Sequence, residues 1–193
     1  MARFDEAYYA KHYLDPHTAV SDEETVERLA KLVCAYAEML DIVIETVLDL
    51  GCGIGLWRAA LQRELLGCEY TGVEISEVVC ARYGWIHGSV VDFTPDEPAD
   101  LVICQGVLQY LDDAQCEEAI SNLAACTAGM LYLEALTKRD WEEAVDQSLT
   151  DGNVHLRTGD WYKQRLAKHF IACGGGVFLA KDQGAVLYEL ERL

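Results

Sequence analysis

The stretch that decides the fold is Val47-Leu48-Asp49-Leu50-Gly51-Cys52-Gly53-Ile54-Gly55, in which an apolar run ends in three alternating glycines. The run is typical of a strand buried on both faces, and a helical pattern follows it at about 55–66. Strand, glycine turn and helix in this order are typical of the first unit of an open α/β sheet. A turn without Cβ atoms lets a ligand approach the backbone, so we expect a nucleotide-like cofactor there.

Working outward, short apolar runs alternate with helical patterns. We expect strands at 46–50, 70–74, 85–91, 101–104 and 130–133, and helices at 55–66, 76–83, 113–126 and 159–170. Ser21 and Glu24 form a capping box for a further helix ahead of the first strand. This alternation predicts a single doubly wound, Rossmann-like α/β domain: a seven-stranded, mostly parallel sheet with helices on both faces.

The two ends of the chain depart from this alternation. Near the C-terminus, strand-like runs at 177–181 and 185–190 flank Asp182-Gln183-Gly184, which predicts a hairpin that adds an antiparallel strand. Residues 1–20 hold an aromatic and histidine cluster, which we interpret as an N-terminal arm. The domain then spans 21–193, with a substrate-side insert at about 134–160.

The charge and the cysteine content of the chain limit the classes of partner and the compartment that we expect. Asp and Glu number 33 against 15 Lys and Arg among 193 residues, a formal net charge of -18. A field of that sign repels phosphate backbones and anionic lipid, so nucleic acid and membrane surfaces are poor partners, and no apolar run approaches the roughly 20 residues of a membrane helix. The eight cysteines form no CxxC unit, so we expect no metal site and a cytoplasmic location. We further expect a monomer or homodimer that acts on a small molecule.

Two acidic residues follow the next predicted strands. Glu74 lies 19 residues after Gly55, where a carboxylate can accept from both ribose hydroxyls; alternatively it only caps the Ser76 helix. Asp92 can accept an adenine amino proton between Val91 and Phe93, or it can simply cap a turn. The glycine pattern is GxGxG, with Leu56 where a GxGxxG dinucleotide fingerprint requires glycine, which disfavours close pyrophosphate docking.

These motifs, with Gly-Val-Glu-Ile-Ser at 72–76 and Ala-Asp-Leu-Val-Ile-Cys-Gln-Gly-Val-Leu-Gln-Tyr-Leu at 99–111, resemble the class I S-adenosylmethionine-dependent methyltransferases over residues 45–136. The resemblance implies that Asp49 and the glycines surround the methionine end of the cofactor, Glu74 the ribose and Asp92 the adenine, with Gln105 near the methionine amino group. The expected cofactor-binding residues are Asp49, Gly51, Cys52, Gly53, Gly55, Glu74, Ile75, Val91, Asp92, Phe93, Gln105 and Tyr13. The chain lacks the Asn-Pro-Pro-Tyr or Asp-Pro-Pro-Tyr segment of amide and base amino methyltransferases, which argues against adenine or glutamine as the acceptor.

Methyl transfer from a sulfonium is a direct displacement, so the protein mainly aligns the nucleophile and excludes water. Tyr8, Tyr9 and Tyr13 are candidates for a lid over the cofactor, although terminal aromatics also pin an arm to the core. His155 is a candidate base and Tyr9 a candidate catalytic residue; a loop histidine is otherwise simply solvated. Three arginines, Arg58, Arg157 and Arg165, either bind a substrate carboxylate or form surface ion pairs.

The sequence therefore predicts an S-adenosylmethionine-dependent methyltransferase that methylates an O, N or S nucleophile of a small molecule and leaves S-adenosylhomocysteine. A second hypothesis is a methyltransferase-like subunit that binds the cofactor or a partner without catalysis. A third, an NAD-dependent oxidoreductase, is disfavoured by Leu56 and by the lack of a separate catalytic domain.

Overall fold

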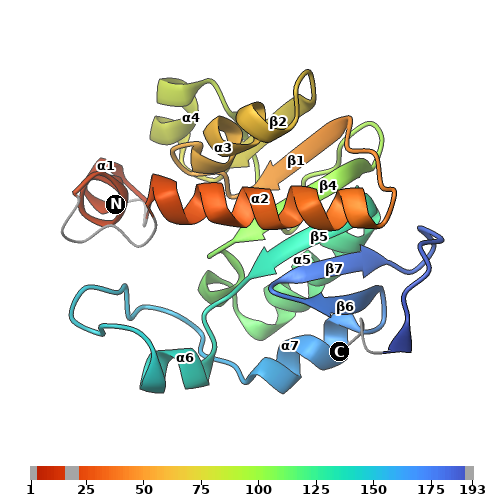
Figure 1. The fold of residues 1–193 in the computed structure, drawn as a ribbon. Coiled ribbons are helices and arrows are strands. Elements are labelled where there is room, and N and C mark those ends of the chain that lie inside the picture. The colour runs from red at the N-terminus through yellow and green to blue at the C-terminus, as the bar shows by residue number, and fades with distance from the viewer. Residues whose placement is uncertain (1–3, 16–21, 190–193) are drawn as a thin grey trace.

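Seven strands form one sheet in the computed structural model, which describes residues 4–15 and 22–189 (Figure 1). The strands are β1 Thr46–Leu50, β2 Glu69–Glu74, β3 Ile86–His87, β4 Ala99–Gln105, β5 Thr127–Glu134, β6 Phe170–Gly174 and β7 Val177–Ala180. Their order in the sheet is β3-β2-β1-β4-β5-β7-β6. The first five run parallel to one another, whereas β7 is antiparallel to both β5 and β6. The predicted seven-stranded, mostly parallel sheet is confirmed.

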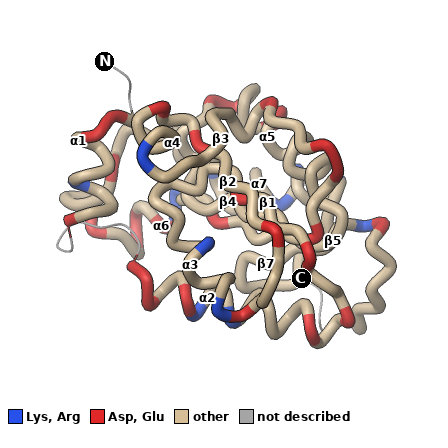
Figure 2. The backbone as a smooth tube through the Cα atoms, turned by 90° about the horizontal axis from the view of Figure 1, so that it is seen from above, with Lys and Arg blue, Asp and Glu red and all other residues tan. Residues whose placement is uncertain are grey.

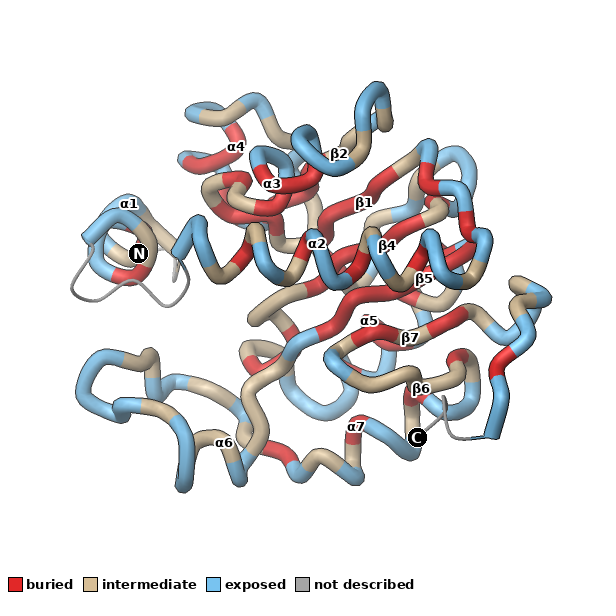
Figure 3. Tube along the Cα trace, in the orientation of Figure 1, coloured by how far each residue is buried: buried red, intermediate tan, exposed pale blue. Residues whose placement is uncertain are grey.

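Helices cover both faces of this sheet, as predicted. They are α1 Glu6–Tyr9, the π-helical turn η1 Ala10–Leu14, α2 Glu23–Met39, α3 Leu56–Glu64, α4 Glu77–Tyr83, the 3-10 turn η2 Leu108–Tyr110, α5 Asp113–Cys126, α6 Lys138–Glu143 and α7 Gly159–Leu166. Alternate residues of β4 enter different cores: Val102 packs with α5 and α7, and Ile103 packs with α2 and α3. The buried strands between these layers form the red centre of Figure 3.

The N-cap of the long helix α2 lies one residue after the predicted cap. Asp22 is the N-cap, and its carboxylate accepts from the amide of Thr25. Ser21, the predicted cap, lies outside the described residues. None of the described helices is long and apolar enough to cross a membrane.

The C-terminal hairpin exists, but the predicted position was wrong. It joins β6 and β7 through Gly174-Gly175-Gly176, and each of these glycines has a positive φ that a side chain would strain. The predicted helix at 159–170 ends at Leu166, so that Phe170–Gly174 forms a strand instead. Residues 185–189 form no strand. The glycine triplet reverses the chain earlier than Asp182-Gln183-Gly184, and β7 pairs with β5 on its other side.

The third strand is shorter than the predicted segment 85–91. Only Ile86 and His87 pair with β2, and the chain then leaves the sheet. The amides of Asp92 and Phe93 donate to the carbonyl of Ser89, which folds the following residues into a turn. This early exit decides which residues of the segment reach the site.

The insert between β5 and α7 is fixed to the domain at its C-terminal end by a buried arginine. The Arg157 guanidinium donates to the carboxylate of Asp113 and to the carbonyls of Leu108 and Leu111, and it lies over the ring of Trp161. Its backbone carbonyl accepts from the amide of Lys138 at the other end of the insert. Arg157 is therefore a structural residue, and α6 is held at the end of the sheet toward which β4 and β5 point (Figure 1).

Candidate active site

Two adjoining cavities lie where the parallel strands end. Strand order reverses between β1 and β4, and ligands of open α/β sheets bind in the crevice at such a point. The first cavity measures about 120 Å³ and the second about 460 Å³. Both are lined by Tyr13, Gly51, Gln105, Gly106 and Tyr110. The two cavities therefore adjoin and form one crevice. We call the five residues that line both cavities its waist.

The three glycines of the turn serve different purposes. A Cβ at Gly51 would overlap the side chain of Val107, and one at Gly55 would lie 2.6 Å from Trp85, so these two glycines permit packing. A Cβ at Gly53 would meet only the rings of Tyr13 and Tyr9, at 3.6 and 3.8 Å. Gly53 is therefore the glycine of this turn whose open side faces the crevice.

Glu74 is a buried carboxylate at the end of β2, only 3% exposed. Its Oε2 accepts from the amide of Gly53 at 3.1 Å, and its Oε1 accepts from the amide of Ser76 at 2.9 Å. The ring of Tyr9 lies beside Glu74 in the lining of the same cavity. Glu74 therefore bonds to Ser76 at the start of α4 and also lines the first cavity. The sequence had offered these two positions as alternatives.

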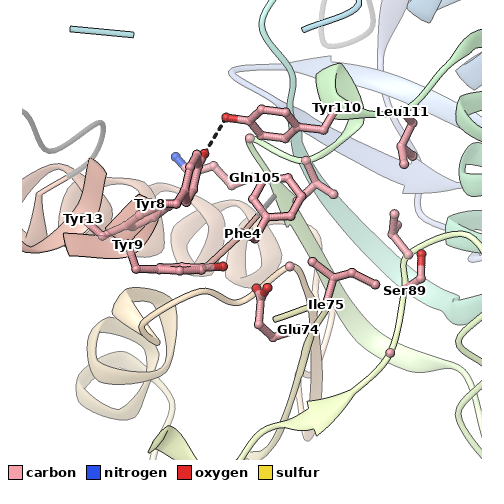
Figure 4. Close-up of a pocket in the computed structure, with 15 residues that line it drawn as sticks. Phe4, Tyr8, Tyr9, Tyr13, Glu74, Ile75, Ser89, Gln105, Tyr110 and Leu111 are labelled. Atoms are coloured by element: carbon pink, nitrogen blue, oxygen red, sulfur yellow. Dashed lines mark hydrogen bonds between the residues drawn. The ribbon is translucent and has the colours of Figure 1, made fainter. Parts of the chain in front are cut away.

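The arm covers the first cavity with aromatic rings (Figure 4). The hydroxyls of Tyr8 and Tyr110 are 2.7 Å apart, and the ring of Phe4 contacts both of these tyrosines edge-on. The hydroxyl of Ser76 donates to the Phe4 carbonyl at 2.6 Å. Burial, followed by the charge of Glu74, raises the pKa of Tyr9, so its hydroxyl stays protonated and acts as a donor rather than a base.

Asp49 lies in the wall of the second cavity and is 1% exposed. Its carboxylate accepts a hydrogen bond from the hydroxyl of Tyr70. Burial, reinforced by the negative charge of Glu74, raises the pKa of Asp49 to about 7. A cation placed beside Asp49 would favour its ionised form.

The sequence analysis expected Gln105 at the crevice but missed four residues that hold the crevice in shape: Trp57, Trp85, Gln109 and Glu134. The side chain of Gln105 accepts from the Trp57 indole at 2.7 Å and donates to Glu134 at 3.1 Å. The side chain of Gln109, 7% exposed, donates to the carbonyl of Gly106 at 2.8 Å. The indole of Trp85 donates to the carbonyl of Gly53 at 2.9 Å. A polar residue inside the apolar run Val107-Leu108-Gln109-Tyr110 was the available signal for Gln109.

The residues expected around adenine do not reach the crevice. Asp92 is exposed, and Val91 and Phe93 pack against the core on the α5 side. The first cavity is lined instead by Gly88, Ser89 and Val90, because the chain turns away from the sheet directly after β3.

The expected base and two of the arginines also lie elsewhere. His155 is exposed and lines neither cavity, although its amide donates to the carbonyl of Gln109 at 2.8 Å. Arg165 pairs with Glu117 at 2.5 Å, and Arg58 lies over the ring of Trp85, 5.4 Å from its centroid. The remaining expected residues, Cys52 and Ile75, line the second and the first cavity respectively.

Solved structures with the same fold include two that are named as methyltransferases. DesVI of Streptomyces venezuelae superposes with a TM-score of 0.65 at 15% identity, covering 93% of this chain and 99% of that one. Magnesium protoporphyrin IX methyltransferase of Synechocystis PCC 6803, with bound S-adenosylmethionine, gives 0.61 at 17% identity over 82% and 78%. The plantazolicin methyltransferase BpumL, in complex with S-adenosylhomocysteine and a desmethyl substrate analogue, gives 0.64 at 15% identity over 84% and 73%.

The sequence agrees with this structural likeness. No curated protein matches the chain. A family model described as a methyltransferase domain matches residues 20–179, most of the chain and all seven strands except the last residue of β7. With a crevice at the switch point of the sheet and S-adenosylmethionine as the cofactor of the domain, the chain belongs to the methyltransferase-domain family.

Proposed function

We propose that this protein is an active enzyme that moves the methyl group of S-adenosylmethionine to a small-molecule acceptor. The observation that carries the proposal is the pairing of Gly53 with Glu74: a glycine with its open side toward the crevice lies beside a buried carboxylate at the next strand end. When bound, the cofactor supplies an activated methyl group on a sulfonium. The protein then has to bind, orient and desolvate the reactants.

The residues present fit this cofactor. Glu74 is positioned to accept hydrogen bonds from the ribose hydroxyls. Ile75, Ser89 and Val90 supply the wall of the cavity for the adenine. The middle of the cofactor would lie in the space beside Gly53, which a side chain at this position would occupy. Gln105 at the waist and Asp49 in the wall of the second cavity would lie near the methionine end, where the carboxylate of Asp49 can pair with an ammonium group.

The arm is proposed to close over the bound cofactor. Its tyrosines line the first cavity together with Glu74, the carboxylate that the ribose would use. Entry of the cofactor therefore requires the arm to move, and its return would exclude water from the sulfonium.

The second cavity is proposed to hold the acceptor. Its volume of about 460 Å³ lies within the range of about 300–1,000 Å³ of small-molecule sites. The insert supplies part of its wall through Asp140, Val145 and Thr150, so residues 134–160 would determine specificity. All eight cysteines are free thiols, which supports a reducing compartment such as the cytoplasm.

Incubation with methyl-labelled S-adenosylmethionine and a metabolite extract tests the proposal. We expect label in a small molecule, together with S-adenosylhomocysteine. Binding of the cofactor without any labelled product would favour the non-catalytic subunit, and tighter binding of NAD would favour the oxidoreductase.

Glu74→Gln should weaken binding of S-adenosylhomocysteine by about 10- to 150-fold, because hydrogen bonds to a charged group contribute about 1.5–3 kcal/mol. Isothermal titration calorimetry measures the dissociation constant. Glu77→Gln, an exposed position on α4, is the matched control and should bind normally. An unchanged constant in folded Glu74→Gln would remove this carboxylate from the ribose site.

Gly53→Ala should abolish cofactor binding at a modest cost in stability. Its φ of +53° costs a side chain about 1–2 kcal/mol, and the new methyl group enters the crevice. Gly84→Ala is a matched control, since Gly84 has a φ of +78° and open space around its Cβ position. Thermal unfolding should show similar losses in both variants. Normal binding by Gly53→Ala would show that the turn is only a packing element.

Affinity for S-adenosylhomocysteine should rise with pH between about 6 and 8. Asp49 has a pKa of about 7 and must lose its proton before it can pair with the ligand's ammonium group, so deprotonation favours binding. Asp49→Asn should flatten this dependence, whereas Asp92→Asn, an exposed position, should retain it. The same pH slope in Asp49→Asn would assign the titration to another group.

Hydrogen exchange should detect closure of the arm. Amides from Tyr8 to Tyr13 should exchange more slowly once S-adenosylhomocysteine is bound, while those of α7, far from the first cavity, should not change. Equal exchange of the arm with and without ligand would contradict the proposed lid.

A further inference from the structure

The second cavity has an unusually one-sided charge. Four carboxylate residues line it: Asp49, Glu134, Asp140 and Asp151. No Lys, Arg or His is among the described residues of its wall. Acidic residues also outnumber basic ones along the whole backbone (Figure 2). An anionic acceptor would meet repulsion from the carboxylates in this wall.

The basic residues nearest in sequence to this wall are engaged elsewhere. Lys138 and Arg139 form exposed ion pairs along α6 with Glu142 and Glu143. The guanidinium of Arg157 is turned into the domain, where it bonds to Asp113 and to backbone carbonyls. The insert therefore brings carboxylates to the cavity and uses its cations for structure.

Neutral donors hold two of the wall carboxylates in place. Glu134 accepts from the side-chain amide of Gln105 and from the hydroxyl of Tyr132, both through Oε2. Asp140 accepts from the amide and hydroxyl of Thr137. Such bonds orient a carboxylate but leave its net charge in the cavity.

The cofactor accounts for only part of this charge. It carries a sulfonium and an ammonium, but also a carboxylate, so its net charge is about +1. Asp49, beside the glycine turn, suffices for the ammonium. Glu134, at the end of β5, and Asp140, in the insert, line the same cavity in addition to Asp49. Aromatic side chains of Tyr13, Trp57 and Tyr110 line the same space, and aromatic faces attract cations.

We propose that the acceptor is a small molecule with a cationic amine, and that the methyl group goes to its nitrogen. This inference rests on the proposed function and specifies its substrate class. The bound ammonium first gives a proton to a cavity carboxylate or to water. The nitrogen lone pair then forms the bond to the methyl carbon while the carbon–sulfur bond breaks and leaves its electrons on sulfur. The products are a methylated ammonium and S-adenosylhomocysteine, and the carboxylates bind a positive charge before and after transfer.

Charge fractionation of the acceptor tests the substrate class. A metabolite extract is separated at pH 7 into cations, neutral compounds and anions, and each fraction is incubated with the protein and methyl-labelled cofactor. We expect label in the cationic fraction, with mass spectrometry placing the methyl group on nitrogen. Label from the whole extract that appears instead in neutral or anionic products, or on oxygen or sulfur, would overturn this inference alone. The proposed function would fail differently, since the unfractionated extract would then yield no labelled product.

Variants of the cavity wall test the recognition itself. Glu134→Gln combined with Asp140→Asn should raise the KM for the labelled amine at least tenfold, while the dissociation constant of S-adenosylhomocysteine changes less than about twofold. Glu143→Gln, on the exposed side of α6, is the control and should leave both values unchanged. An unchanged KM in the double variant would overturn recognition by these carboxylates.

Discussion

The buried carboxylate of Glu74 is the interaction on which the site depends. It accepts from two backbone segments: the glycine turn through the amide of Gly53, and the start of α4 through the amide of Ser76. A buried carboxylate must have donors, because an unpaired buried charge costs several kcal/mol. The strand end thus fixes the turn and the start of α4 together, and Tyr9 of the arm lines the same cavity. A ribose that bonds to Glu74 would leave the two backbone amides in place, so the turn would keep its position while the arm moves.

Parallel pairing explains how much of this site the sequence predicts. The carboxyl ends of neighbouring parallel strands meet at one edge, so Asp49, Glu74 and Gln105 had to come together once their strands were recognised. Their signals are local: an apolar run, then glycine or a polar residue. The residues after β3 lacked such a signal, because the place where that strand ends depends on its pairing with β2 rather than on its own composition. A strand that is two residues long carries the chain out of the sheet before Asp92, so Ser89 and Val90 reach the crevice instead.

The remaining differences come from contacts over long sequence distances. Phe170 continues the four-residue spacing of the buried Tyr162 and Leu166 of α7, and only the reversal at Gly174-Gly175-Gly176, with pairing to β7, makes this segment a strand. Arg157 is 44 residues from its carboxylate partner Asp113. Sequence spacing alone does not distinguish such an arginine from one that binds a substrate. Burial together with carbonyl acceptors does, and these are properties of the folded chain.

The same distinction between structural and chemical roles separates the two halves of the crevice. In the first cavity, each oxygen of the Glu74 carboxylate already accepts from a backbone amide, so specificity there comes from shape and from the acceptor positions that remain. In the second cavity, Glu134 and Asp140 are oriented by the neutral groups of Gln105 and Thr137, which do not offset the charge of these two carboxylates. Since burial already raises the pKa of Asp49 to about 7, each further negative charge in this space is costly, and a cation offsets that cost most directly. The electrostatics of the cavity therefore favour an acceptor that arrives with a positive charge and leaves with one.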